Sequence, residues 1–455
     1  MSLLFIAWRN FRYRALSSFL TTLSLTLGVA LVVLVMSIYG IISEAFVRNA
    51  SVGYNLVVGP KGSTLQLTLN AVYYLSQPIE NLPYTEYMEF FTKEERAEMV
   101  RTFGGDPALG ERDGVYAGYM KGGYAIPLAL GDYFGEFRVV GTTPDFFELL
   151  KHGPDVDQDF TFREGRNFEY HNEENSYYEC VLGARVADEM GVGVGDVMNP
   201  THGDPDGKGH GQGFQIVGVL DSTGTPNDRA AFVNMEGFYL LEGHAKPIPD
   251  DAVIVLPESA TNADPDEPLL LTIPEREVTS ILVRNGNLMM APQLQNRIKE
   301  SVRAEAATPI GEINKLMSMI VGPLMQALLA ITLITCVVAA VGVLVAIYNS
   351  MNDRKRDIAV MRALGARRGS VTWIILFESL IIALIGGVAG WFLAHLGIYL
   401  ASPLIESRTG VSVGLFSISQ YELFLLPLVI GLSLLAGIVP AASAYRTDVG
   451  TNLSA

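Results

Sequence analysis

Four long apolar runs stand out along the chain, separated by segments in which charged and polar residues recur. The runs lie between Arg14 and Glu44, Lys315 and Asp353, Arg368 and Glu406, and Glu422 and Arg446. An α-helix needs about 20 residues to cross the apolar core of a bilayer, so each run is long enough to span a membrane. The pattern therefore predicts four transmembrane helices, at residues 16–43, 320–350, 371–402 and 421–445.

The first apolar run is too long for a cleavable signal peptide, whose core takes about 7–15 residues. No small-residue cleavage motif follows it, and we expect it to remain as an anchor. Residues 1–15, which precede it, mix apolar side chains and Trp8 with Arg9 and Arg12. This composition suits a helix lying in the membrane interface. A plain extension of the first span on the cytoplasmic side fits it equally well.

Residues 46–315, between the first two spans, alternate short apolar runs with Gly and Pro, the pattern of a folded domain with strands and helices. The expected strands are 54–58, 137–140, 179–182, 214–220, 252–256 and 279–283. The expected helices are 92–103, 184–190 and 291–305. The fold class that follows is an α-helical membrane protein with four transmembrane helices and an inserted α+β extracytoplasmic domain.

The distribution of charge predicts which segments lie on which side of the membrane. Residues 46–315 hold 21 Lys/Arg and 41 Asp/Glu, a net charge of −20, whereas the rest of the chain holds 11 and 7, a net of +4. Short loops rich in Lys and Arg stay in the cytoplasm. We therefore expect residues 46–315 outside a cytoplasmic (inner) membrane, and both termini, including the tail 446–455, inside. The acidic outer segment argues against a nucleic-acid partner.

The loop at residues 351–369 joins the second and third spans and is strongly basic. Ile358, Met361 and Leu364 recur at three-residue spacing, which predicts a short helix, and Gly365 predicts its end. Such a helix suits docking into a groove of a cytoplasmic partner through its apolar side. The alternative is a topology signal that only touches lipid headgroups.

Several motifs carry a likeness to a known family. Arg354 to Ala366 reads RKRDIAVMRALGA and matches the pattern R-x-x-E-I-x-x-x-R-A-x-G-A, with Asp357 where Glu is usual. Glu378 and a Gly-rich patch follow in the third span. Three further stretches fit the same family: Ala7-Trp8-Arg9-Asn10, Val181-Leu182-Gly183 with the Gln215 to Leu220 run, and Gly437-Ile438-Val439-Pro440 before Arg446. Together these features resemble the FtsX/MacB-like family of ABC transporter permeases.

The resemblance implies a non-catalytic subunit that forms a homodimer and recruits a dimer of cytoplasmic ABC ATPase subunits. ATP and Mg²⁺ would bind to that partner, and this chain would need no cofactor. Consistent with this, the sequence contains no G-x-x-x-x-G-K-[ST] phosphate-binding loop. Membrane lipid and a periplasmic or outer-membrane protein are the other implied partners. The implied ATPase-coupling residues are Arg354, Arg356, Asp357, Ile358, Met361, Arg362, Leu364 and Gly365.

The third span contains an ionisable group and a small-residue patch. Glu378 is costly inside a membrane and is therefore a functional candidate. We favour a structural hydrogen-bonding role for it over ion translocation. Gly386, Gly387 and Gly390 suit the close approach of a neighbouring helix.

One loop of the outer segment gathers potential metal ligands. Residues 201–213 read THGDPDGKGHGQG, in which His202, Asp204, Asp206 and His210 could hold Zn²⁺. The two histidines are far apart in a Gly-rich loop, so nothing in the sequence presets their geometry. We therefore favour a flexible polar hairpin tip without a metal.

Three functions fit these observations. The leading one is export or extraction of a substrate (a lipoprotein, peptide or toxin) driven by a separate ATPase. In the second, the ATP cycle moves the outer domain to regulate a periplasmic enzyme, by mechanotransmission without transport. The third is metal handling, suggested only by the loop at residues 201–210.

The predicted topology is tested by cysteine labelling in a Cys-less background, with an impermeant thiol reagent applied to intact spheroplasts. Ser222→Cys, in the acidic outer segment, should label strongly, and Ser350→Cys, next to the basic loop, should not. The reverse pattern would show that the topology is inverted.

Overall fold

The computed structural model describes residues 3–13, 15–49, 53–78, 80–153, 157–203, 207, 209–248, 252–257, 268–353, 355–363 and 365–409, with isolated residues between 427 and 445. These residues form two compact units. The outer domain is formed mainly by residues 45–316, and the membrane unit by the residues before and after them.

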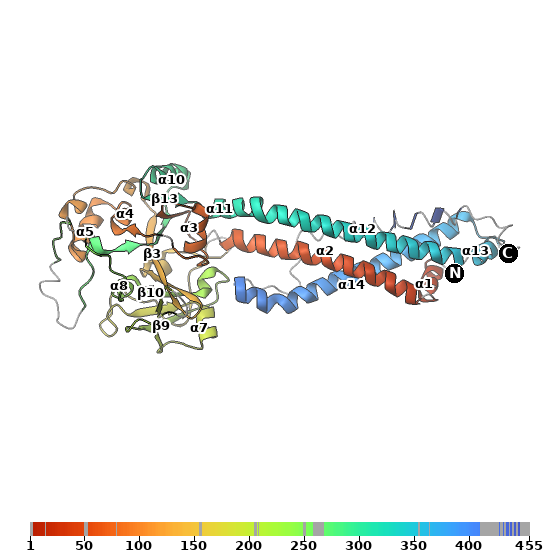
Figure 1. Cartoon of the computed structure of the whole chain (residues 1–455), viewed down its shortest axis with the longest axis horizontal. Coiled ribbons are helices and arrows are strands. Elements are labelled where there is room, and N and C mark those ends of the chain that lie inside the picture. The colour runs from red at the N-terminus through yellow and green to blue at the C-terminus, as the bar shows by residue number, and fades with distance from the viewer. Residues whose placement is uncertain are drawn as a thin grey trace. The chain divides into compact units, whose positions relative to one another are not determined.

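The outer domain is built on one 11-stranded sheet, whose main path runs β13, β1, β12, β3, β4, β10, β6, β9, β5 (Figure 1). The pairs β4–β10 and β6–β9 are parallel, and the other pairs are antiparallel. The strands on this path are β1 (Leu56–Pro60), β3 (Tyr124–Phe134), β4 (Phe137–Thr142), β5 (Phe162–Gly165), β6 (Glu179–Leu182), β9 (Phe214–Leu220), β10 (Ala230–Asn234), β12 (Ser280–Arg284) and β13 (Ala304–Ala307). Off this path, β7 (Val197–Met198) pairs with β9 and β8 (Thr201–His202) with β3, while β2 (Leu82–Pro83) and β11 (Glu277–Val278) form a second sheet.

The first strand of the outer domain lies between two of its last strands. β1 pairs with β12, with Leu56 opposite Val283, and with β13, with Val57 opposite Ala307. Asn55 extends the first pairing, because its amide donates to the Val283 carbonyl at 3.1 Å. The chain therefore enters and leaves this domain through neighbouring strands.

Helices and the main apolar core cover the sheet. Every residue of β4, β6 and β10 is buried, so both faces of these strands are covered. Apolar side chains of this kind supply about 25 cal/mol per Å² of surface removed from water. The helices of the domain are α3 (Thr64–Ala71), α4 (Tyr84–Met88), α5 (Lys93–Phe103), α6 (Asp145–Leu149), α7 (Ala184–Met190), α8 (Met235–Tyr239), α10 (Ala291–Lys299) and α11 (Pro309–Leu316).

Most of the expected elements are present, with two corrections. α5 begins after Thr92, whose hydroxyl and backbone form a capping box with Glu95. The run 252–256 is not a strand: within it, only Val255 pairs, in a single bridge to Gly105. The helix expected at 291–305 ends at Lys299, because the residues that follow form β13 against β1.

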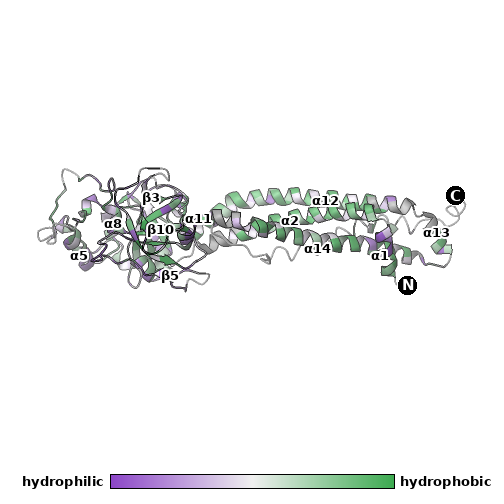
Figure 2. Ribbon diagram, turned by 90° about the horizontal axis from the view of Figure 1, so that it is seen from below, coloured by the Kyte–Doolittle hydropathy of each residue, from purple (hydrophilic) through white to green (hydrophobic). Residues whose placement is uncertain are grey.

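The described helices of the membrane unit are α1 (Leu3–Tyr13), α2 (Ala15–Asn49), α12 (Gly322–Asp353), α13 (Lys355–Ala363) and α14 (Arg368–Thr409). Among the described residues, three segments are long and apolar enough to cross a membrane: Ala15–Ile41, Pro309–Asn349 and Gly369–Pro403. Figure 2 shows the apolar colouring along α2, α12 and α14. The fourth expected span, residues 421–445, and the tail 446–455 lie almost wholly outside the described residues.

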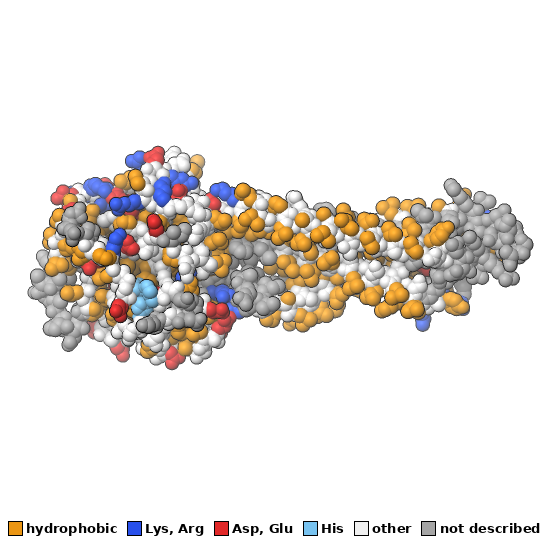
Figure 3. All heavy atoms as spheres, viewed as in Figure 1, with side chains coloured by type: hydrophobic (Ala, Val, Ile, Leu, Met, Phe, Trp, Pro, Cys, Tyr) orange, Lys and Arg blue, Asp and Glu red, His pale blue; other side chains and the backbone are white. Residues whose placement is uncertain are grey.

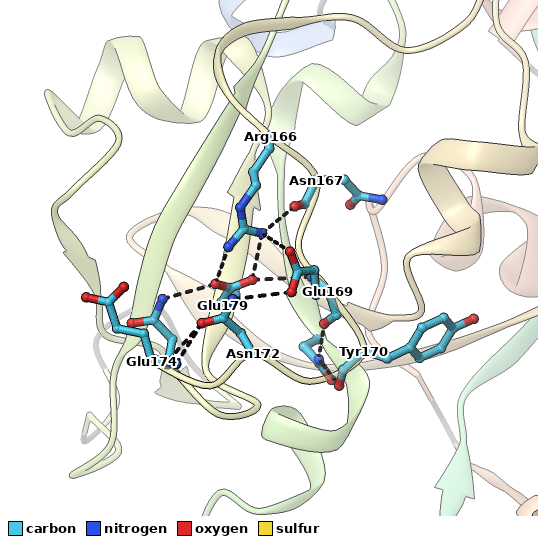
Figure 4. A network of polar contacts seen from close by, with 9 residues as sticks. Arg166, Asn167, Glu169, Tyr170, Asn172, Glu174 and Glu179 are labelled. Atoms are coloured by element: carbon cyan, nitrogen blue, oxygen red, sulfur yellow. Dashed lines mark hydrogen bonds and ion pairs between the residues drawn. The ribbon is translucent and has the colours of Figure 1, made fainter.

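A buried carboxylate links β6 to the polar loop before it (Figure 4). The Glu179 side chain is 1% exposed and accepts hydrogen bonds from Arg166 Nη2 at 2.7 Å and Nη1 at 3.0 Å. The Asn175 side chain and the Glu169 amide donate to it as well. Burial raises the pKa of Glu179, but these donors outweigh burial and hold that pKa below its ordinary value of 4.5.

This depressed pKa predicts a loss of stability in acid. A carboxyl whose pKa is lowered in the folded state stabilises it above the unfolded pKa, and this contribution disappears as pH falls through the folded value. Glu179→Gln should therefore lower the free energy of unfolding at pH 7 and flatten its decline below pH 4.5. Urea unfolding of the full-length protein, followed by near-UV circular dichroism at pH 7 and in acid, measures both effects.

The matched control is Glu98→Gln, which removes a carboxylate from a surface pair with Arg101, where both side chains are 72% exposed. Exposed pairs contribute only about 0–1 kcal/mol. Equal pH dependence of the Glu179 variant and the wild type would show that the network adds nothing to acid stability.

Candidate functional site

Two glycines of α14 let α2 approach it closely. A Cβ at Gly390 would lie 2.6 Å from the backbone oxygen of Thr26 and 2.8 Å from Val29 Cβ. A Cβ at Gly386 would lie 3.0 Å from Leu25 Cδ2. Gly387, the third glycine of the predicted patch, is half-buried. Small residues at such contacts allow tight backbone packing between helices in lipid.

Glu378 lies inside the membrane unit. It is 7% exposed on α14, and the adjacent Ser379 is fully buried. Ser379 Oγ donates to the Leu376 carbonyl at 2.8 Å, and a Cβ on Gly437 would lie 2.6 Å from the same Oγ. The carboxyl group is therefore enclosed by the unit in a single chain, as expected for a group that is costly to expose to lipid. Its structural role stays a prediction.

The short helix predicted in the basic loop is present as α13, between α12 and α14. It ends in a Schellman motif: the Gly365 amide donates to the Arg362 carbonyl at 3.1 Å, and the Ala366 amide to the Met361 carbonyl at 3.0 Å. Gly365 has φ +98°, a region that glycine enters without strain. The expected stop at Gly365 is therefore confirmed.

The apolar residues of α13 do not all point outward. Met361 is half-buried and packs against the core shared by α2, α12 and α14, while Ala359 is fully buried. Val360, by contrast, is 42% exposed. Arg356, Asp357 and Ile358 belong to α13 by their backbone, whereas Arg354 and Leu364 lie outside the described residues. Among the described side chains of this helix, Val360 is thus the exposed large apolar residue, and Ala363 is exposed as well.

A separate cluster gathers in the outer domain, where three histidines surround one carboxylate. Asp132 Oδ1 lies 3.3 Å from His202 Nδ1, and Asp132 Oδ2 lies 3.0 Å from His210 Nε2 and 3.3 Å from His244 Nε2. His202 Nδ1 is also 3.3 Å from His244 Nε2. One ligand atom from each of the four residues lies within 4.8 Å of the others. Figure 3 shows histidine side chains at the surface of this domain.

Three separate segments bring the four side chains together. Asp132 lies in β3 at an irregularity in its pairing with β4, between Leu130 and Tyr133. His202 lies opposite Asp132 in β8, and the His210 amide donates to the Pro200 carbonyl at 3.0 Å. His244 follows α8. The cluster therefore joins β3, the loop at residues 201–210 and the turn after α8.

The Asp132 side chain is completely buried, and those of His210 and His244 are 6% and 5% exposed. Burial lowers the pKa of His210, and Asp132 offsets this only in part, so the neutral imidazole with a free lone pair is favoured at pH 7. Neutral imidazole and carboxylate are ligands of Zn²⁺ and related ions.

Comparisons with known proteins agree with the helices and the inserted domain. A model of the MacB-like periplasmic core domain matches residues 18–267, more than half of the 455-residue chain. A model of the FtsX-like permease C-terminal region matches residues 329–449. The chain belongs to the FtsX/MacB-like family of ABC transporter permeases. Its family is one of inner-membrane permeases with a periplasmic domain.

Individual relatives are distant from this permease. It is 23% identical to an uncharacterised ABC transporter permease of Methanocaldococcus jannaschii, over 88% of this chain and 83% of that protein. It is 24% identical to the macrolide export ATP-binding/permease protein MacB of Syntrophobacter fumaroxidans, over 68% of this chain but only 46% of that protein. It is 26% identical to the pyoverdine export ATP-binding/permease protein PvdT of Pseudomonas fluorescens, over 64% and 40%.

Two members of the histidine cluster, His202 and His210, were predicted as candidate metal ligands from the sequence. Asp132 and His244 were not predicted, because Asp132 reaches the loop through the pairing of β3 with β8 and His244 comes from the turn after α8. Asp204 and Asp206 lie outside the described residues. One signal was available: Asp132 is a lone carboxylate within the run YAIPLALGDYF, and a charged side chain is rarely buried in a strand without a partner.

The contact between α2 and α14 gives a prediction. Gly390→Leu should drive the two helices apart, because its Cβ meets backbone, and the strain should cost about 1–3 kcal/mol or more. Gly397→Leu on the same helix is the control, since a Cβ there has nothing within 4 Å. All three tryptophans, Trp8, Trp373 and Trp391, belong to the membrane unit. Their fluorescence during thermal unfolding in nanodiscs should show a lower midpoint for Gly390→Leu alone, and equal midpoints would refute the close contact.

Proposed function

We propose that this permease couples ATP hydrolysis by a separate ATPase to movement of its outer domain, and so drives export or extraction of a substrate. The observation that carries the proposal is α13, a short helix with a defined end that joins two apolar helices long enough to span a membrane. A helix in this position can receive force from a cytoplasmic protein and pass it to both of its neighbours.

The relatives support export as the class of function. Two of them are named for export of a macrolide or of pyoverdine. The two named substrates differ chemically, so they do not select a substrate for this permease. The chain spans less than half of those two relatives, whose names include an ATP-binding part. Since these 455 residues contain no phosphate-binding loop, we assign ATP and Mg²⁺ to a partner subunit.

The membrane unit also supports a homodimer. In the most apolar part of each span, the share of buried residues is 44% for Ala15–Ile41 and 50% for Gly369–Pro403. The same share is only 22% for Pro309–Asn349, the segment that contains α12. Among the described residues, most of the apolar surface of α12 is therefore not covered by other helices. We propose that α12 faces the twofold axis, an isologous arrangement in which the same surface serves both subunits.

Docking through α13 is tested by Val360→Glu. Val360 is 42% exposed, so the change should leave the permease itself folded. A carboxylate placed in an apolar groove of the ATPase would be buried without a partner, at a cost of several kcal/mol. We expect loss of co-purification with the ATPase encoded nearest to this permease, and loss of permease-stimulated ATP hydrolysis in nanodiscs.

Arg367→Ala is the matched control, because it removes one exposed charge next to the same helix. Such a charge contributes about 0–1 kcal/mol, so coupling should fall only slightly. Wild-type coupling in the Val360→Glu protein would mean that the basic segment only fixes topology.

A further inference from the structure

The cluster of Asp132, His202, His210 and His244 has contacts that hydrogen bonding does not explain. The three nitrogen–oxygen distances are 3.0, 3.3 and 3.3 Å, short enough for hydrogen bonds. Nevertheless, neither Asp132 oxygen nor His210 Nε2 has a hydrogen-bond partner of acceptable alignment among the described residues. The Asp132 oxygens and the three histidine nitrogens therefore lie close together without forming well-aligned hydrogen bonds.

The nearby guanidinium of Arg138 interacts electrostatically with this carboxylate but makes no contact ion pair with it. Arg138, on the neighbouring strand β4, stacks 4.2 Å above the Tyr133 ring and donates from Nη2 to the Ser76 carbonyl at 2.9 Å. No Lys or Arg among the described residues forms an ion pair with Asp132; its charged-group contacts there are the three histidines. A fully buried carboxylate without a hydrogen bond or a contacting Lys or Arg is costly, and a bound cation would offset this cost.

We propose that these four residues bind a divalent transition-metal ion, Zn²⁺ in the first instance. In a tetrahedral Zn²⁺ site with bonds of 2.0–2.1 Å, neighbouring ligand atoms lie about 3.3 Å apart. The contacts of Asp132 Oδ2 with His210 and His244, and the 3.3 Å contact between His202 Nδ1 and His244 Nε2, fall at or near this edge length. His202 Nδ1 contacts the other carboxylate oxygen, Oδ1, at 3.3 Å. Four protein ligands close the coordination sphere, as in structural zinc sites.

The ligand chemistry narrows the choice of ion. Three imidazoles and one carboxylate suit Zn²⁺, Cu²⁺, Ni²⁺ or Co²⁺, whereas Ca²⁺ and Mg²⁺ prefer all-oxygen sites with more ligands. A tetrahedral arrangement selects Zn²⁺ and Co²⁺ over the square-planar preference of Cu²⁺ and Ni²⁺.

The bound ion would act as a clamp. The ligands come from β3, the loop at residues 201–210 and the turn after α8, so one ion fastens a short edge pairing and two loops to the main sheet. The pairing of β8 with β3 involves only two residue pairs, so a bound ion would add a strong link to a short contact. Metal binding at this site in the outer domain would not depend on whether α13 docks an ATPase.

Metal content and coordination geometry test the proposal on the full-length permease in nanodiscs, purified with an affinity tag free of histidine. After chelator treatment, addition of ZnCl₂ and dialysis, elemental analysis should find one Zn²⁺ per chain. Substitution with Co²⁺ should give the intense visible bands of a tetrahedral ion. Zn²⁺ should also raise the unfolding midpoint of the outer domain, because it binds the folded state.

Variants decide whether these four residues are the ligands. His202→Ala is the main test: its side chain is 58% exposed, so its removal should leave the fold intact. We expect it, and His210→Ala, to weaken Zn²⁺ binding by at least about 100-fold, since even residues that only orient a ligand cost 10–100-fold. His171→Ala, an exposed histidine of the same domain outside the cluster, is the control and should bind like the wild type. Failure of the wild type to retain Zn²⁺, or equal retention by His202→Ala, would overturn the proposal.

Discussion

The pairing of β1 with β12 and β13 is the interaction on which the architecture depends. A domain of this size can be inserted between two membrane-spanning helices only if its ends meet, and the sheet brings them together by backbone hydrogen bonds. Leu56 faces Val283 and Val57 faces Ala307, so residues more than 220 positions apart become neighbours. Asn55 and Asn285 reinforce the junction, since the Asn285 amide donates to the Asn55 side chain at 3.1 Å. The remaining strands build outward from this group.

The sequence predicted elements whose signal is local. The strands 179–182 and 214–220 are present with the expected bounds, because each is an apolar run bounded by Gly or polar residues. β3 was missed because Gly131 and Asp132 within its apolar run look like a turn, and the structure accommodates them as an irregularity in the pairing. The run 252–256 is apolar but Val253 and Val255 are more than half exposed, so composition alone was misleading there.

The candidate sites also divide into features set by local sequence and features set by long-range packing. The end of α13 at Gly365 follows from local backbone chemistry and was predictable. The inward direction of Met361 depends on where the helix packs, which no local pattern encodes. The histidine cluster depends on a long-range strand register and on His244, outside any motif, so only the folded domain reveals it. Family membership was accessible from sequence because its motifs are concentrated in one basic segment and the helix after it.

The antiparallel junction has a mechanical consequence. β1 begins, and β13 ends, at the same end of their ladder, where Val57 lies opposite Ala307, while Pro60 lies opposite Ala304 at the other end. A force pulling the two chain connections apart would break the hydrogen bonds between β1 and β13 one at a time, starting from this end. Less force is needed to break them in sequence than all at once. A displacement shared by both connections loads none of these bonds and carries the strands along as one body. When both connections move together, the junction of β1 and β13 therefore moves as one body. When the connections are pulled apart, the junction opens.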